Sequence, residues 1–261
     1  MFAATVAEAR KQGLPVIGHI PRNFAPATAF AGGLDAVVHT EEFFFTWFKG
    51  PRSIVDMDRS YRADLSTLPG LIALLKDNDV AVMPNLSFTY TNFVMWDGLE
   101  NLWNDPEVRY MHPDTLFGWQ VSNINRREEI ENFVVRGQWK YDLMQELTRE
   151  FQKAGILQVL ATDASAPGLF PGKSAHRELT ELVKAGLTNF EVLSIATRNA
   201  GEFVRRYIDS EARFGQLLPG YRADFVLLAD NPLEDVRNMR SIRGVAVNGR
   251  WQDQEALQRG R

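Results

Sequence analysis

The sequence contains no cysteine, which excludes disulfide bonds and any metal site built on thiolates. It has only four histidines, at positions 19, 39, 112 and 176. A divalent metal would therefore take its ligands from these histidines and from carboxylates. The lack of cysteine does not identify a compartment, because such a chain survives in oxidising and reducing surroundings alike.

A basic excess and long hydrophobic runs are also missing. Lys and Arg number 29 against 33 Asp and Glu, a net charge of -4, so we expect no nucleic-acid partner. No apolar run reaches the roughly 18 residues that span a bilayer, so we expect no membrane segment. Residues 1–12 lack the pattern of a signal peptide and instead repeat apolar residues at helical spacing. The sequence leaves localisation unassigned.

Short apolar runs alternate with helical patterns along most of the chain. The runs lie at 14–22, 34–42, 80–85 and 156–165, and helices are expected at 2–12, 25–32, 65–77, 127–154, 174–184 and 189–204. This alternation favours an α/β fold with a parallel sheet, and strands apolar on both faces suit such a sheet. After Gly215, short runs joined by Pro-Gly and Asn-Gly predict a small β appendage.

His19, His39 and Asp163 each end one of the apolar runs. The carboxyl ends of parallel barrel strands meet at one mouth, so residues far apart in sequence can reach one ion. Imidazole and carboxylate are ligands that Zn²⁺ accepts without sulfur. A bound ion would lower the pKa of a coordinated water to about 7, and a nearby carboxylate could take its proton. These residues therefore predict a metal-dependent hydrolase site.

Each of these residues also has a structural interpretation. A histidine at a strand end can be a hydrogen-bonded structural residue, and Asp163 can cap the helix that follows. His176, in PGKSAHRELTEL, is either a polar residue of a first helical turn or a substrate contact.

Two features follow His39 directly. Glu41 and Glu42 either face the mouth or lie in a solvated loop, and the solvated loop is the default expectation. The aromatic cluster of Phe43, Phe44, Phe45, Trp47 and Phe48 either lines an apolar substrate pocket or packs between loops.

Several longer segments extend these patterns: GLPVIGHIPR, DAVVHTEE, VLATDAS, HRELTELVKAGLTNFEVLSIATRNAGEF, GQLLPGYRADFVLLADNPLEDV and VAVNGRW. Together they resemble the amidohydrolase superfamily, most nearly its imidazolonepropionase-like and prolidase-like metal-dependent hydrolases. The resemblance implies a (β/α)8 TIM barrel holding one or two divalent ions, zinc first among them, beside a small β-sandwich. It assigns residues 1–205 to barrel strands 5 to 8 and residues 206–261 to the C-terminal strands of the composite sandwich domain.

The resemblance also implies roles for the site. His19 matches the metal histidine at the end of the fifth strand, and His39 that of the sixth. Asp163 matches the acid at the end of the eighth, which is a metal ligand and shuttles the catalytic proton. The implied activity is hydrolysis of an amide, cyclic amide or peptide-like C–N bond by metal-activated hydroxide. The implied partner is a small-molecule or dipeptide-like substrate, and a homo-oligomer stays open.

The chain departs from the family pattern in two ligands. The H-x-H pair of the first barrel strand and the bridging lysine of the fourth have no counterpart, and the sequence begins at what resembles the helix after the fourth strand. We expect a truncated chain, because half a parallel barrel exposes two strand edges. The alternatives are a non-catalytic remnant or binding protein with an incomplete metal site, and an unrelated barrel enzyme whose His and Asp act without metal.

Overall fold

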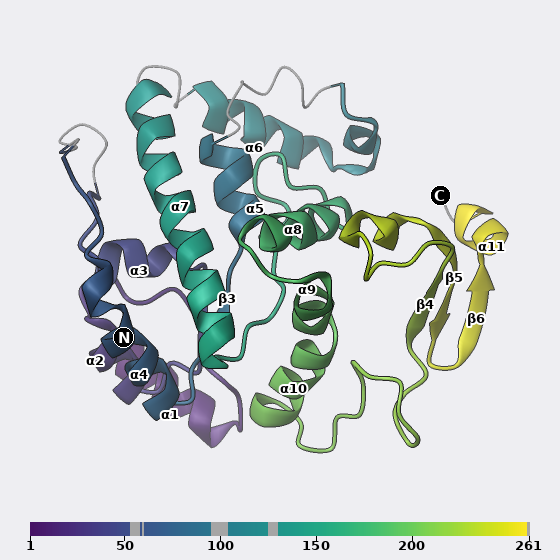
Figure 1. The fold of residues 1–261 in the computed structure, drawn as a ribbon, viewed down its shortest axis with the longest axis horizontal. Coiled ribbons are helices and arrows are strands. Elements are labelled where there is room, and N and C mark those ends of the chain that lie inside the picture. The colour runs from purple at the N-terminus through teal and green to yellow at the C-terminus, as the bar shows by residue number, and fades with distance from the viewer. Residues whose placement is uncertain (53–57, 59, 95–103, 125–129, 260–261) are drawn as a thin grey trace.

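The computed structural model describes residues 1–52, 58, 60–94, 104–124 and 130–259 (Figure 1). Its N-terminal part holds a parallel sheet of order β1-β2-β3, formed by β1 (Ile17–Gly18), β2 (Ala36–Val38) and β3 (Ala81–Met83). Ile17 pairs with Ala36, and Val37 pairs with Val82. The predicted α/β organisation with a parallel sheet is confirmed. The division into barrel and sandwich domains at residue 205 stays a prediction.

The fourth predicted strand, 156–165, is wrong as a strand. This segment forms an isolated parallel bridge between Val82 and Gln158. Val82 donates to the carbonyl of Leu157 and accepts from the amide of Val159, both within 3.0 Å. The next amide, that of Leu160, donates its hydrogen bond to the carbonyl of Ile195 instead. Pairing ends there because the chain leaves the sheet for the helices that follow.

The helices connect and cover these strands. The sheet region contains α1 (Phe2–Lys11), α2 (Pro26–Ala31), α3 (Glu41–Thr46), η1 (Leu65–Thr67), α4 (Leu68–Asp77) and α5 (Leu86–Thr89). Beyond it lie η2 (Tyr90–Val94), η3 (Pro106–Tyr110), α6 (Pro113–Ile124), α7 (Ile130–Ala154), α8 (Lys173–Lys184), α9 (Asn189–Ala196) and α10 (Arg198–Tyr207). The helix predicted over 127–154 is confirmed from residue 130, and 127–129 lie outside the described residues. The helix predicted over 189–204 is two helices that meet at Thr197.

The long helix α7 joins two hydrophobic cores. Leu143, Leu147 and Phe151 recur every fourth residue, lie on one face and pack with the helices around the parallel sheet. Tyr141 and Met144 face the other way and pack with α8 and α9. In Figure 1, α7 runs beside both groups of helices. This placement explains why a long helix is stable here, since it buries apolar side chains on two faces.

The C-terminal segment forms an antiparallel sheet of β4 (Phe225–Leu228), β5 (Ile242–Val247) and β6 (Arg250–Asp253), with η5 (Val236–Arg240) before β5 and α11 (Gln254–Arg259) at the end. The predicted β appendage is confirmed, and Asn248 and Gly249 form the turn between β5 and β6 with positive φ at both residues. Figure 1 shows this sheet at the opposite end of the long axis from α1–α4.

Apolar side chains of this sheet are only partly covered. Phe225, Leu227 and Trp251 are between 39% and 51% exposed. A cavity of about 610 Å³ separates β4 and β5 from α9 and α10. Among the described helices, none is both long and apolar enough to cross a bilayer.

Candidate functional site

The ends of the parallel strands bring two of the predicted residues together. His39 directly follows β2, and its side chain is only 5% exposed. Its Nε2 lies 3.8 Å from Oδ2 of Asp163, which comes from the segment after the Gln158 bridge. Burial lowers the pKa of His39, so the imidazole is neutral at neutral pH. A neutral imidazole facing a carboxylate can ligate a metal or exchange a proton.

His39 and Asp163 share an unusual backbone with a third residue, Asn85, which follows β3. Their φ angles are 66°, 56° and 54°, all in the left-handed region. Few non-glycine residues adopt it, and His, Asn and Asp do so more often than others. Such strained residues cluster at functional sites. Positive φ also occurs at Lys49, Asp79 and Asn248. What distinguishes His39, Asn85 and Asp163 is that they lie together at one sheet edge, which favours this edge as the candidate site.

His19 joins the same cluster after β1. Its ring stacks on that of His39, with centroids 5.0 Å apart and planes inclined by 22°. Its Nδ1 lies 2.7 Å from Oε1 of Glu42, a side chain that is 2% exposed. The hydrogen bond to Glu42 raises the pKa of His19. A carboxylate on one ring nitrogen is the usual support of a metal-binding histidine, because it leaves the other nitrogen directed outward.

The prediction that Glu41 and Glu42 lie in a solvated loop is wrong, because both side chains are buried in α3. Glu41 accepts a 2.6 Å hydrogen bond from the ammonium of Lys140, which is 2% exposed. Burial by itself would raise the pKa of Glu41, but the charge of Lys140 outweighs it and the pKa is lowered. No local pattern in the sequence indicates that Lys140, on α7, would neutralise this acid.

Asn85 completes the cluster and was not predicted as a site residue. Its Nδ2 lies 3.1 Å from Nδ1 of His39, and the residue is 1% exposed. Its Oδ1 is buried and has no hydrogen-bond partner within the described part of the chain. The signal in the sequence was its position, since Asn85 ends an apolar run as His39 and Asp163 do.

The donor chemistry of His19, His39 and Asp163 suits a divalent ion, because two imidazoles and a carboxylate lie together with a buried carbonyl oxygen unpartnered beside them. Their convergence is incomplete. Within the described ranges, no group of three or more His, Cys, Asp or Glu side chains is arranged to hold a metal ion. The cluster thus supplies ligands of the right kind without forming a closed site.

His176 lies apart, in the first turn of α8. Burial and the nearby charge of Arg240 lower its pKa. This position fits the interpretation as a first-turn helix residue, and its role in substrate binding stays a prediction.

The aromatic cluster after His39 belongs to the core. Phe43, Phe44, Phe45 and Phe48 are at most 8% exposed, and Phe43 packs edge-on against Phe151 of α7. These residues pack between elements, and the interpretation as a substrate pocket is not supported.

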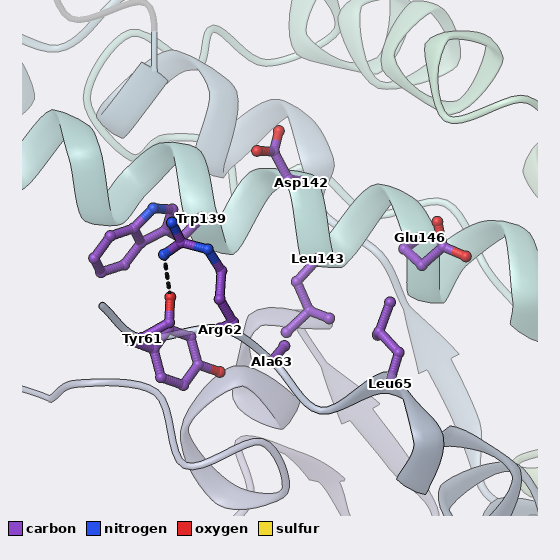
Figure 2. Close-up of a pocket in the computed structure, with 8 residues that line it drawn as sticks. All are labelled: Tyr61, Arg62, Ala63, Leu65, Trp139, Asp142, Leu143 and Glu146. Atoms are coloured by element: carbon purple, nitrogen blue, oxygen red, sulfur yellow. Dashed lines mark hydrogen bonds between the residues drawn. The ribbon is translucent and has the colours of Figure 1, made fainter. Parts of the chain in front are cut away.

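A cavity of about 470 Å³ lies between α7 and the segment 61–65. Trp139, Asp142, Leu143 and Glu146 of α7 line it, and Figure 2 shows Leu143 pointing toward that segment. The cavity contains none of the predicted site residues. The strand-end cluster, and not this cavity, carries the candidate chemistry.

Comparison with known proteins bears on the fold. The fold matches the solved structure of bottromycin amidohydrolase with a TM-score of 0.68 and 22% identity, over 99% of this chain and 54% of that one. It matches a putative prolidase from Bifidobacterium longum with a TM-score of 0.62 and 20% identity, over 96% and 50% of the two chains. The chain shares its fold with amidohydrolases. This confirms the resemblance predicted from the sequence.

The chain also matches ochratoxinase. It is 36% identical to ochratoxinase of Aspergillus niger over 93 residues, which are 36% of this chain and 18% of the relative. The solved A. niger ochratoxinase gives a TM-score of 0.61 with 19% identity, over 97% and 44% of the two chains. No protein-family profile matches the chain. The chain therefore spans about half the length of the structures it resembles.

Proposed function

We propose that this chain carries part of the active site of a metal-dependent hydrolase that cleaves amide, cyclic amide or peptide-like C–N bonds. The observation that carries the proposal is the meeting of His39, Asp163 and His19 at one edge of the parallel sheet. Its support from relatives is that the similar structures include an amidohydrolase and a prolidase. The substrate class, a small molecule or dipeptide, is part of the proposal.

In this proposal His19, His39 and Asp163 hold the divalent ion, zinc in the first instance. When bound, such an ion polarises a carbonyl and lowers the pKa of a coordinated water. Asp163, half exposed at the cluster, accepts a proton at a carboxylate oxygen and returns it to the leaving amine. Buried Glu42 orients His19 through its Nδ1.

A second candidate is a binding role without turnover. It is favoured by the incomplete convergence of ligands in the described part of the chain. It shares the metal ligands with the first candidate and differs only in catalysis, so one experiment can separate the two.

The experiment measures bound Zn²⁺ by dialysis and elemental analysis, and hydrolysis of a panel of dipeptides and N-acyl amino acids. We expect the full chain to bind Zn²⁺, and His39→Ala and Asp163→Asn to lose most of it. His112→Ala is the matched control, since His112 is exposed and caps α6 through the amide of Asp114. Equal zinc content in all variants would overturn the ligand assignment, and zinc binding without turnover would favour the second candidate.

A further inference from the structure

Asn85 contacts the ring of His39 at the nitrogen opposite the one that faces Asp163. It contacts Nδ1 at 3.1 Å, while Nε2 on the other side of the ring faces Asp163 at 3.8 Å. An amide offers both an acceptor and donors, so it can pair with Nδ1 whether or not that nitrogen carries the proton. Either way, the contact fixes the ring so that Nε2 faces the cluster.

The backbone of Asn85 is itself held in place. Glu178 of α8 accepts hydrogen bonds from the amides of Leu86 and Ser87, at 3.0 and 2.7 Å. These are the first residues of α5, directly after Asn85. The fully buried carboxyl group of Glu178 thus anchors the turn in which Asn85 takes its left-handed conformation.

We propose that Asn85 is a positioning residue that holds the ring of His39 in one orientation, pairs with Nδ1 in either tautomer and thereby presents Nε2 as a metal ligand. This inference rests on the proposed function and extends it to a residue outside the ligand set. When Nε2 donates its lone pair to an ion, the ring proton resides on Nδ1 and needs an acceptor. The buried Oδ1 of Asn85, unpartnered among the described residues, becomes that acceptor by a half turn of the amide.

The tautomer change conserves protons and charge. One proton leaves Nε2 for water and one proton from water binds Nδ1, so the imidazole stays neutral throughout. The amide then exchanges its Nδ2 contact for an Oδ1 contact with the same ring nitrogen.

Two substitutions at position 85 distinguish the effect of the Asn85 side chain from that of its backbone conformation. Asn85→Asp keeps an acceptor oxygen and a residue type that tolerates positive φ. Asn85→Gly removes the side chain and keeps the left-handed backbone without strain. We expect Asn85→Asp to bind Zn²⁺ within about threefold of the unmodified chain, and Asn85→Gly to bind about 10–100-fold more weakly. Titration calorimetry with Zn²⁺ on the full chain measures both.

A second readout does not depend on metal. The ¹⁵N chemical shifts of the His39 ring in the metal-free chain report its tautomer. We expect one tautomer in the unmodified chain, the Nδ1–H form in Asn85→Asp and a mixture in Asn85→Gly. Unchanged shifts in Asn85→Gly, or zinc binding in Asn85→Asp as weak as in Asn85→Gly, would overturn the role of Asn85. If no variant binds zinc, the proposed function fails while the ring shifts still decide the positioning role.

Discussion

The parallel sheet and the C-terminal sheet use apolar side chains in opposite ways. Ala36, Val37 and Val82 of the parallel sheet are fully buried, whereas Phe225, Leu227 and Trp251 of the C-terminal sheet keep about two fifths to one half of their surface exposed. The parallel sheet also ends in left-handed polar residues that meet in one cluster, and the C-terminal sheet ends in an ordinary Asn-Gly turn. Tight packing on both faces is what can hold strained residues in place. The candidate site therefore lies at the ends of β2 and β3, the strands with the tighter packing.

The largest expected change in the free energy of unfolding comes from replacing a phenylalanine in the core around the parallel sheet, compared with one in the C-terminal sheet. Phe151→Ala removes a fully buried ring between α3 and α7 and should lower the free energy of unfolding by about 3–5 kcal/mol. Phe225→Ala in β4 removes a ring that is 39% exposed and should lower it by about 1 kcal/mol or less. Chemical denaturation of both variants measures the difference. Equal losses would mean that the two sheets are equally well packed.

The second test compares buried and exposed charges on α7. Lys140→Met leaves the carboxylate of Glu41 buried without its partner and should lower the unfolding free energy by about 3–5 kcal/mol. Lys153 pairs with Glu150 at the surface, so Lys153→Met should change it by less than about 1 kcal/mol. The double variant Lys140→Met with Glu41→Met should regain much of the loss. No recovery there would show that Lys140 acts by packing and not by its charge.

The third test uses pH. Burial raises the pKa of Glu178 to about 7, above the 4.5 of an exposed glutamate. As pH rises, Glu178 ionises in the unfolded chain at a lower pH than in the folded chain. The stability that its neutral form contributes is therefore complete below pH 4.5 and is lost as pH rises to about 7. That loss is about 3 kcal/mol. Denaturation curves across this range should show it in the unmodified chain and not in Glu178→Gln.

Asp224, next to β4 of the C-terminal sheet, serves as a control because its pKa is shifted in the opposite direction to that of Glu178. The hydrogen bond from the amide of Asn248 lowers the pKa of Asp224 below 3.8. Its contribution is therefore present above pH 3.8 and is lost as pH falls through the lowered pKa. Asp224→Asn should leave the profile between pH 4.5 and 7 unchanged. A change there would show that the two regions are electrostatically linked.

The smallest expected change in stability concerns the contact between α10 and the segment 214–215, which leads to the C-terminal sheet. A Cβ at Gly201 of α10 would lie 2.3 Å from the carbonyl oxygen of Phe214, so Gly201→Ala should destabilise the chain by about 1–3 kcal/mol. Gly118 of α6 has open space around it, and Gly118→Ala should stabilise by up to about 1 kcal/mol. Thermal unfolding of both variants is the measurement. A neutral Gly201→Ala would mean that α10 and the 214–215 segment separate easily.

Much of the fold was predictable because its signals are local. Alternating apolar runs and helical periodicity gave the parallel strands and most helices, and Asn248-Gly249 gave the C-terminal hairpin. The segment 156–165 failed because its apolar composition does not show where the chain leaves the sheet. Strand pairing is a tertiary property, and only the bond from Leu160 to Ile195 reveals that departure.

The candidate site was predictable in part for the same reason. His39 and Asp163 meet at the sheet edge as expected, although Asp163 follows an isolated bridge at Gln158 and not a strand. Glu42 and Lys140 could not be placed, because a charged residue is solvated by default unless a distant partner neutralises it. Asn85 was missed because an amide is a poor metal ligand, although its position matched that of the ligands.

The left-handed backbone at His39, Asn85 and Asp163 limits how this site can be rebuilt. Residues with branched or bulky side chains disfavour that conformation, while Asn, Asp, His and Gly accept it. Exchanges within this small set leave the strand ends unstrained, and exchanges outside it change the chain path as well as the chemistry. A library aimed at new specificity should therefore draw these positions from those four residue types and place its diversity in the surrounding loops.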